Sequence, residues 1–242
     1  MKVLICIPTY NEAESIGPLL EEIFGLGLGF EILVIDDNST DGTGKIVKEA
    51  QGRYPGLHLL SRRGKLGLAS AYLAGFQYGV NHGYDYIGEM DADFSHPPGS
   101  LKVVHRIIHG RRPGFIVGSR YVEGGATKNW PLWRQIISAG GSWYARTILS
   151  APIRDLTGGY NFWSAESLKT MNFSSCISDG YVFQVELKYR ALLRQLSFVE
   201  FPILFEERRV GQSKISRRIV FEAIYKVWIL RLNRQKLFTN IN

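Results

Sequence analysis

Cysteine is scarce in this sequence, and two common phosphate-binding loops are missing from it. The 242 residues include two cysteines, Cys6 and Cys176. They make neither a disulfide framework nor a metal-site spacing, so we expect a reducing compartment. No GxxxxGK[ST] is present and no GxGxxG follows a predicted strand, which argues against a nucleotide-hydrolysing phosphate loop and a dinucleotide fingerprint. The glycine cluster GLGLG at 25–29 is expected to mark the end of a helix.

Long apolar runs are also absent. No stretch approaches the ~18 uncharged apolar residues of a membrane span. The N-terminal MKVLICIPTY has about five apolar residues before Pro8, too few for a signal peptide. We therefore expect a cytoplasmic protein that does not cross a bilayer. With 45% apolar residues, the chain is able to bury a substantial core.

Acidic residues are scarce near the C-terminus, where the basic residues gather. Between Arg208 and Lys236 there are nine Lys or Arg residues and one acid, Glu222, so this segment carries +8 while the whole chain carries +7. Both a nucleic-acid binder and a protein on an anionic membrane concentrate charge in this way. A nucleic-acid binder would leave the acidic residues described below unexplained. We therefore expect no nucleic-acid partner.

Strand-like and helix-like segments alternate along the first half of the chain. The predicted strands are 2–8, 30–36, 57–61, 84–90 and 114–119, and the predicted helices are 12–24, 42–50, 67–80 and 99–109. This β–α order predicts an α/β fold with a doubly wound, mostly parallel sheet. After Arg120 this regular alternation ends, and we expect an appended second part. It would contain helices near 132–149 and 180–194, a short piece GGYNFW and a strand 197–205.

Polar side chains follow the predicted strands at the edge where such sheets bind ligands. The strands end in PTYNE, DDNSTDGT, DADFSHPP and GSRY. In an extended segment, residues i and i+2 face the same side. Asp91 and Asp93 could therefore converge on one hard divalent cation, which also bridges to phosphates. The structural alternative is a turn, because Asp favours turns as well.

Two further groups have both a structural and a functional interpretation. Asp37 or Asn38 could cap the next helix, while an acid at 36 or 37 could accept hydrogen bonds from a nucleotide base or ribose. The segment EERRVGQSK at 206–214 offers Arg208 and Lys214 to two phosphate groups. Its alternative is a solvated basic loop.

Five motifs together resemble a known family. In this order, IPTYNE, VIDDNSTDGT, MDADFSHPP, GSRYV and RRVGQSK resemble the inverting glycosyltransferases that use nucleotide-diphosphate sugars, and more narrowly the dolichol-phosphate (polyprenol-phosphate) mannose synthases. The resemblance extends from Lys2 to about Lys236. It implies a nucleotide-diphospho-sugar transferase (GT-A) fold. The catalytic domain would span 1–205, with a donor half at about 1–120 and an acceptor half at about 121–205, and 206–242 would form a basic diphosphate-closing loop and an amphipathic helix.

The resemblance also implies roles for particular residues. Asp93 and Ser95 would be the protein ligands to Mg²⁺ or Mn²⁺, and Arg120 would lie beside the sugar and the acceptor. Arg208 and Lys214 would close over the diphosphate. Apart from the resemblance, His96 is expected to be structural, packing in the turn before the two prolines. The remaining donor-binding residues would be Pro8, Tyr10, Glu12, Ile35 and Asp37 around base and ribose, and Asp91, Ala92 and Asp93 around ribose and diphosphate. The candidate catalytic residues are Asp91, Asp93, Arg120, Arg208 and Lys214.

The implied reaction transfers mannose from GDP-mannose to dolichyl or polyprenyl phosphate with inversion. A phosphate monoester has its second pKa at about 6, so the acceptor is already an ionised nucleophile and no general base is required. Two departures stand out: Asn161 replaces an arginine usual in the family, and the C-terminal membrane spans of many bacterial relatives are not in this sequence. The alternatives are a transferase using UDP-glucose or another nucleotide sugar, and a catalytically silent nucleotide-sugar-binding scaffold.

The predicted C-terminal helix, 215–232, has a stripe of apolar residues and basic flanks, which is typical of an interfacial helix. Its apolar residues are Ile219, Val220, Ala223, Ile224, Val227, Trp228 and Leu230, and the flanking basic residues are Arg217, Arg218, Lys226, Arg231 and Arg234. Together with the helix 132–149 and Trp130, Trp133 and Trp143, it predicts a peripheral protein on the cytosolic face of a membrane. Alternatively, the helix packs on the sheet or docks against a small membrane subunit.

Overall fold

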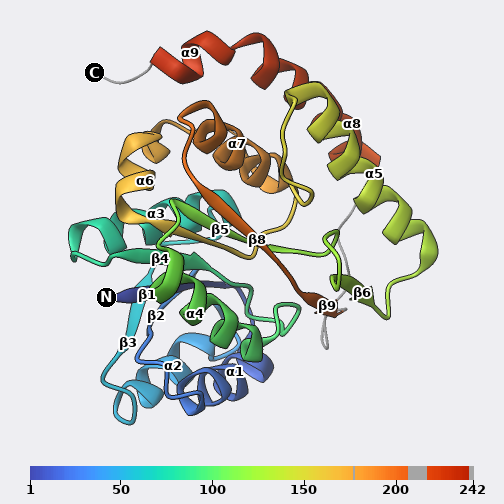
Figure 1. The fold of residues 1–242 in the computed structure, drawn as a ribbon. Helices are drawn as coiled ribbons and strands as arrows, with labels where there is room; N and C mark the ends of the chain where they lie inside the picture. Colours follow the sequence, from blue (N-terminus) through green and yellow to red (C-terminus); the bar gives the residue numbers. More distant parts are fainter. Residues whose placement is uncertain (177, 207–216, 240–242) are drawn as a thin grey trace.

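A computed structural model describes residues 1–176, 178–206 and 217–239. Within these residues, seven strands form one twisted sheet in the order β3-β2-β1-β4-β7-β5-β8 (Figure 1). All of them run parallel except β7, which is antiparallel to both of its neighbours. The strands are β1 Val3–Thr9, β2 Glu31–Asp36, β3 Leu57–Ser61, β4 Tyr86–Glu89, β5 Phe115–Ser119, β7 Asn161–Ser164 and β8 Phe198–Pro202. The doubly wound, mostly parallel α/β sheet predicted from the sequence is confirmed.

Helices cover both faces of the sheet, so there are two cores (Figure 1). One face packs against α1 Ala13–Gly25, α2 Thr43–Gln51 and α4 Leu101–Arg111. The other packs against α3 Leu68–Asn81, α6 Ala165–Thr170 and α7 Gly180–Leu193. Successive residues of a strand point to opposite faces, and in β1 Leu4 and Cys6 enter one core while Ile5 and Ile7 enter the other. The strands therefore appear in the sequence as continuous apolar runs.

Two glycines bring α3 unusually close to the sheet. A Cβ on Gly75 would lie 2.6 Å from Cys6 Sγ, and one on Gly79 would overlap the side chain of Ile87. The small residues of this helix thus allow its backbone to pack close to the strands. At the end of α1, Gly27 and Gly29 have φ of 64° and 69°. The GLGLG cluster thus ends a helix, as predicted.

The part after Arg120 adds to the same sheet and also forms a small second one. Strand β7 inserts between β4 and β5, and β8 extends the edge. The single strand predicted at 197–205 is wrong, because the chain leaves the large sheet after Pro202. It then forms β9 Leu204–Glu206, which pairs with β6 Ala126–Lys128. Short 3₁₀ turns lie at Pro98–Ser100 and Phe173–Ser175.

Three helices lie outside these layers. α5 Leu132–Leu149 and α8 Arg217–Leu232 run side by side, and α9 Arg234–Thr239 continues over α7 (Figure 1). The Tyr144 hydroxyl of α5 donates a hydrogen bond of 3.3 Å to the Ile224 carbonyl of α8. None of the helices in the described ranges is long and apolar enough to cross a membrane.

Candidate active site

The carboxyl ends of the parallel strands bring the predicted site motifs to one edge of the sheet. Strands β1, β2, β4 and β5 end at Thr9, Asp36, Glu89 and Ser119. Because these strands are parallel, the segments that follow them emerge on the same side. We call this side the catalytic edge. The prediction that PTYNE, DDNSTDGT, DADFSHPP and GSRY meet there is confirmed.

The Asp91–His96 segment is a compact turn held by hydrogen bonds. The Asp91 amide donates to His96 Nδ1 at 3.0 Å, and the Ser95 amide donates to Asp93 Oδ1 at 3.0 Å. Phe94, between Asp93 and Ser95, has φ of 62°. The extended geometry assumed for Asp91 and Asp93 is wrong, because the chain turns at Ala92 and Asp93. Asp91 instead accepts a hydrogen bond of 3.1 Å from the Tyr72 hydroxyl.

Asp93 and Ser95 fit a divalent cation. The Asp93 side chain is buried, and Ser95 Oγ is buried with no hydrogen-bond partner among the residues that the structure describes. Mg²⁺ is typically bound by one or two carboxylates together with water and substrate phosphates. The described residues contain no group of three or more His, Cys, Asp and Glu side chains that could hold a metal. A cation here would therefore need further oxygen ligands from a diphosphate and water.

His96 has a structural role, as predicted. Its ring is buried and lies 4.8 Å from the Tyr160 ring and 5.4 Å from the Phe205 ring, between centroids. Burial lowers the pKa of the imidazole, although the charges of Asp91 and Asp93 oppose this change. A neutral ring is what the hydrogen bond from the Asp91 amide requires, because Nδ1 accepts it.

Asp36 and Asp37 shape the backbone beside β2. Asp36 accepts hydrogen bonds from the Thr9 hydroxyl and from the amide and hydroxyl of Ser39. Asp37 forms an ion pair with Arg62 and accepts a hydrogen bond of 3.1 Å from the Leu66 amide. It thus orders the loop after β3.

The predicted capping of α2 by Asp37 or Asn38 is wrong. Helix α2 begins at Thr43, with Gly42 in the left-handed conformation at the N-cap. The turn before it is held by Asp41, whose Oδ1 accepts from the Thr43 amide at 3.0 Å. Burial would raise the pKa of Asp41, but hydrogen bonds from Thr43 and the Ala13 amide lower it. The start of α2 is therefore stabilised by Asp41 and not by Asp36 or Asp37.

The other predicted donor-binding residues lie along the ends of β1 and β2. Tyr10 is exposed, with Lys65 Nζ 4.0 Å from the centroid of its ring, and Pro8 is half-buried. The Glu12 carboxylate accepts from the Ser15 hydroxyl at 3.0 Å. The Ile35 side chain is buried in the core, so only its backbone is available to a nucleotide. Their role in binding a nucleotide stays a prediction.

Arg120, which follows β5, is held by hydrogen bonds to Asp155 and Thr157. Its Nε and Nη2 donate to the two carboxylate oxygens of Asp155, each at 2.7 Å, and Nη2 also donates to Thr157 Oγ1 at 3.0 Å. The Arg120 amide donates to Asp155 as well. Burial would raise the pKa of Asp155, but the charge and hydrogen bonds of Arg120 lower it. The guanidinium is therefore held in one orientation.

Trp130 brings a second cation beside Arg120. Its ring centroid is 5.7 Å from Arg120 Cζ and 4.0 Å from Arg134 Cζ. Arg134 lies in the first turn of α5 and is buried. Sequence analysis did not single out Arg134, because its proximity to Arg120 depends on the fold of the chain between them.

Three buried ionisable residues near the edge were missed from the sequence: Glu89, Asp155 and Lys188. Glu89 ends β4 and accepts from Trp163 Nε1 at 2.6 Å, and also from Gln184 and Asn161. Burial, only partly offset by these hydrogen bonds, raises the pKa of Glu89 to about 7. An acid inside an apolar strand, as in IGEM, was the one available signal.

Arg208 and Lys214 lie outside the described residues, so their role stays a prediction.

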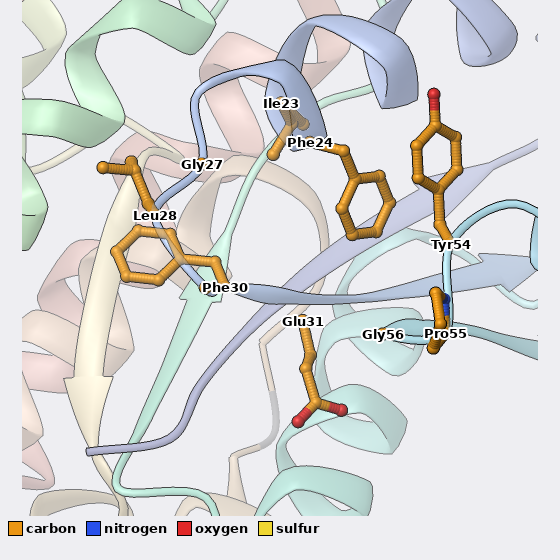
Figure 2. A pocket seen from close by; sticks show the side chains of 10 residues that line it. Ile23, Phe24, Gly27, Leu28, Phe30, Glu31, Tyr54, Pro55 and Gly56 are labelled. Atoms are coloured by element: carbon orange, nitrogen blue, oxygen red, sulfur yellow. The ribbon is translucent and has the colours of Figure 1, made fainter.

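A pocket of about 350 Å³ lies where β2 begins (Figure 2). It is at the opposite end of the strand from the catalytic edge. It is lined by Phe24, Leu28, Phe30 and Tyr54, with Phe24 and Tyr54 stacked at 4.3 Å. Among the predicted site residues that the structure describes, none lines this pocket.

Comparison with known proteins identifies the family. Residues 4–169 match the family model Glycosyl transferase family 2. The chain therefore belongs to glycosyltransferase family 2 and is an enzyme that transfers glycosyl groups.

Three curated relatives cover nearly the whole chain. An undecaprenyl-phosphate mannosyltransferase from Micrococcus luteus is 41% identical over 94% of this chain and 93% of its own. A polyprenol monophosphomannose synthase from Mycolicibacterium smegmatis is 40% identical over 95% of this chain and 88% of its own. A dolichol-phosphate mannosyltransferase from Pyrococcus furiosus is 32% identical over 95% of this chain and 64% of its own.

A solved structure supports the fold. Glucosyl-3-phosphoglycerate synthase from Mycobacterium tuberculosis, in complex with Mn²⁺, UDP and glucosyl-3-phosphoglycerate, matches with a TM-score of 0.62. The match covers 97% of this chain and 79% of that one at 17% sequence identity. The predicted nucleotide-diphospho-sugar transferase (GT-A) fold is confirmed.

Proposed function

We propose that this glycosyltransferase transfers mannose from GDP-mannose to a polyprenyl or dolichyl phosphate, with inversion at the anomeric carbon. The observation that carries the proposal is the pairing, at one sheet edge, of a buried Asp93–Ser95 oxygen pair with the Arg120 guanidinium. The first suits a metal-bound diphosphate, and the second suits an anionic acceptor. The names of the relatives supply the sugar and the lipid class.

The chemistry follows from the charges of the two substrates. An ionised oxygen of the acceptor phosphate attacks the anomeric carbon, and the bond from that carbon to the GDP oxygen breaks. A divalent cation at Asp93 and Ser95 would neutralise charge on the diphosphate. Arg120, with Arg134 beside it, orients the acceptor phosphate and keeps it near the sugar. In this proposal, Arg208 and Lys214 contact the leaving diphosphate.

A substrate panel tests the proposal. Purified protein is incubated with labelled GDP-mannose, GDP-glucose, UDP-glucose or UDP-mannose, Mg²⁺ or Mn²⁺, and polyprenyl phosphate. We expect label in the lipid fraction with GDP-mannose, as a β-linked product. Transfer from UDP-glucose alone would establish the alternative donor, and nucleotide binding without transfer to any lipid would establish the silent scaffold.

We also propose that the enzyme works on the surface of a membrane, as its lipid acceptor requires. The large apolar side chains exposed on α5 and α8 support this location, because soluble surfaces rarely gather so many. They are Leu132, Trp133, Ile136, Ile137 and Trp143 on α5 and Ile224, Tyr225, Trp228 and Leu232 on α8. We call these nine residues the α5–α8 surface. Because α5 begins close to Arg120, an acceptor in the bilayer would have a short path to the catalytic edge.

Parts of the membrane hypothesis need correction. Trp130 is buried, only 7% exposed, against Phe205, so it is not available to a membrane. Val227 and Leu230 of α8 are also buried, on the side where α8 contacts α5 and α7 and not on the sheet that the alternative interpretation named, while Ile224 and Trp228 are exposed. The helix therefore divides its apolar residues between the protein and the outer surface.

A flotation assay distinguishes the modes of attachment. We expect the protein to float with anionic phosphatidylglycerol vesicles at low salt and to detach partly as salt rises, because each basic residue near the surface contributes about 1 kcal/mol. Changing Trp133 and Trp143 to Ser should strongly reduce flotation. The control changes Leu66 and Leu68, exposed outside the two helices, to Ser.

Two outcomes would contradict direct attachment through α5. Equal flotation of the Trp133→Ser/Trp143→Ser variant would rule out α5 as an anchor. No binding of the unaltered protein to any vesicle would favour the small membrane subunit. A third variant measures the electrostatic contribution to vesicle binding. It carries Ser in place of Arg217, Arg218, Arg231 and Arg234.

A further inference from the structure

Lys188 is a fully buried lysine to which the proposed reaction gives no role. It lies in α7, and its Nζ donates hydrogen bonds to the carbonyls of Leu156 and Gly158 at 3.2 and 2.6 Å. Burial lowers the pKa of Lys188 to about 8, and the negative charges of Asp155 and Glu89 oppose that change. A buried ammonium group is costly unless it is paired and hydrogen-bonded.

Lys188 and Arg120 hold the same short loop from two sides. The loop is Asp155–Gly158. Its Asp155 carboxylate binds Arg120 and also accepts a hydrogen bond of 2.9 Å from the Gly158 amide, so both ends of the loop are linked through this carboxylate. Its Thr157 hydroxyl binds both Arg120 and Ser142 of α5. The position of the Asp155 carboxylate therefore depends on carbonyls that Lys188 holds.

The same α7 turn also reaches the donor side of the site. Gln184, one helical turn before Lys188, donates to Glu89, and it accepts from Asn161 Nδ2 at 2.8 Å. Asn161 in turn donates to the Gly158 carbonyl at 3.2 Å. Glu89 lies two residues before Asp91 in the chain. Two buried acids, Glu89 and Asp155, thus lie within electrostatic reach of the buried Lys188.

We propose that Lys188 is a positioning residue for Arg120: it holds the Asp155–Gly158 loop so that Asp155 keeps the Arg120 guanidinium directed at the acceptor phosphate. The kinetic part of this inference rests on the proposed function, since it assigns Arg120 to the acceptor. Lys188 itself touches no substrate. If the lysine were purely structural, its replacement would destabilise the whole fold. It would then affect kcat/KM for the acceptor and the affinity for GDP to the same extent.

The kinetic test compares Lys188→Met with the control Lys169→Met, at an exposed lysine of α6. We expect Lys188→Met to lower kcat/KM for polyprenyl phosphate roughly tenfold or more, the size of effect of one hydrogen-bonded charge. The Kd for GDP, measured by titration calorimetry, should be unchanged. If Lys188→Met does not fold, Lys188→Gln, which keeps an N–H donor, replaces it.

A double-mutant cycle with Arg120→Lys decides whether Lys188 acts through Arg120. If it does, the double variant should be little worse than Arg120→Lys alone. Losses that multiply would overturn the proposal, and so would equal losses in kcat/KM for the acceptor and in GDP affinity.

A substrate-free measurement separates this inference from the proposed function. Hydrogen exchange of the segment 152–160 should become faster in Lys188→Met, while exchange of β1 and β2 stays as in the parent. If the parent protein transfers no mannose, the proposed function fails, and the exchange result still decides whether Lys188 holds the loop. Unchanged exchange at 152–160 would overturn the inference.

Discussion

Asp93→Ala is expected to reduce sugar transfer by about 10³-fold while the protein stays folded. A metal ion supplies several kcal/mol of charge stabilisation in the transition state, and ~4 kcal/mol corresponds to this factor. The buried Asp93 carboxylate accepts a hydrogen bond from the Ser95 amide, and its loss would remove the charged protein ligand of the proposed metal site. Initial rates with saturating GDP-mannose and polyprenyl phosphate, with circular dichroism for folding, measure the effect.

Two controls accompany the Asp93 variant. Glu166→Ala, at an exposed acid that follows β7, should retain the parent rate, because β7 ends at the side of the sheet opposite the catalytic edge. Excess EDTA should abolish transfer by the parent protein, and added Mn²⁺ or Mg²⁺ should restore it. Undiminished turnover in the chelator would exclude a metal at Asp93 and Ser95.

Arg120→Met is expected to destabilise the protein by roughly 3–5 kcal/mol near pH 7, because it removes the ion-pair partner of the buried Asp155 carboxylate. The Asp155 carboxylate is fully buried and takes two short hydrogen bonds from the Arg120 side chain. Transfer should fall as well, since the acceptor phosphate loses its cation. Urea unfolding of the parent and the variant gives the difference in the free energy of unfolding.

The pH dependence of that difference is a sharper test. In the parent, the lowered pKa of Asp155 stabilises the fold above the ordinary aspartate value of 3.8, and this contribution is lost as the pH falls through the lowered pKa. Without the Arg120 side chain, the charge and hydrogen bonds that most lower the pKa of Asp155 are lost, so this carboxylate should take up a proton at a higher pH in the variant than in the parent. The gap in stability should therefore narrow from pH 7 towards pH 4.

Arg111→Met, at an exposed arginine in the last turn of α4, is the matched control and should change stability little. A gap between parent and Arg120→Met that stays constant with pH would show that lost packing, rather than the buried charge of Asp155, accounts for the destabilisation.

The elements that the sequence predicted correctly are those with a local physical signal. Strands such as 30–36 are short apolar runs bounded by turn residues, and the helix at 12–24 has apolar residues at helical spacing. The strand predicted at 197–205 failed because its apolar residues continue across Pro202, while the chain passes from one sheet to another. Helices α6 and α9, six residues each, were too short to show a period.

The candidate site divides in the same way. Asp93, Ser95 and Arg120 follow strand ends, where parallel sheets place their ligands, and motif order was enough to select them. Asp155 and Lys188 were missed because the role of each depends on a contact with a residue that is distant in the sequence. Asp155 lies 35 residues from Arg120, and Lys188 lies 30 residues from Gly158. No spacing rule joins residues so far apart.

By itself, the sequence determined the alternation of strands and helices, the edge at which polar segments gather, and the place of the oxygen-rich segment Asp91–Ser95 after β4. The strands and helices depend on hydrophobic periodicity and on proline, which are signals of a few neighbouring residues. The shared edge follows from the β–α order, because successive strands joined by a helix run parallel. Only the tertiary structure decided that β7 inserts antiparallel between β4 and β5, that Trp130 is buried while Trp133 and Trp143 are exposed, and that Arg120 is held by Asp155. Those outcomes depend on which distant surfaces exclude water from one another, and on the need to pair each buried charge with one of opposite sign.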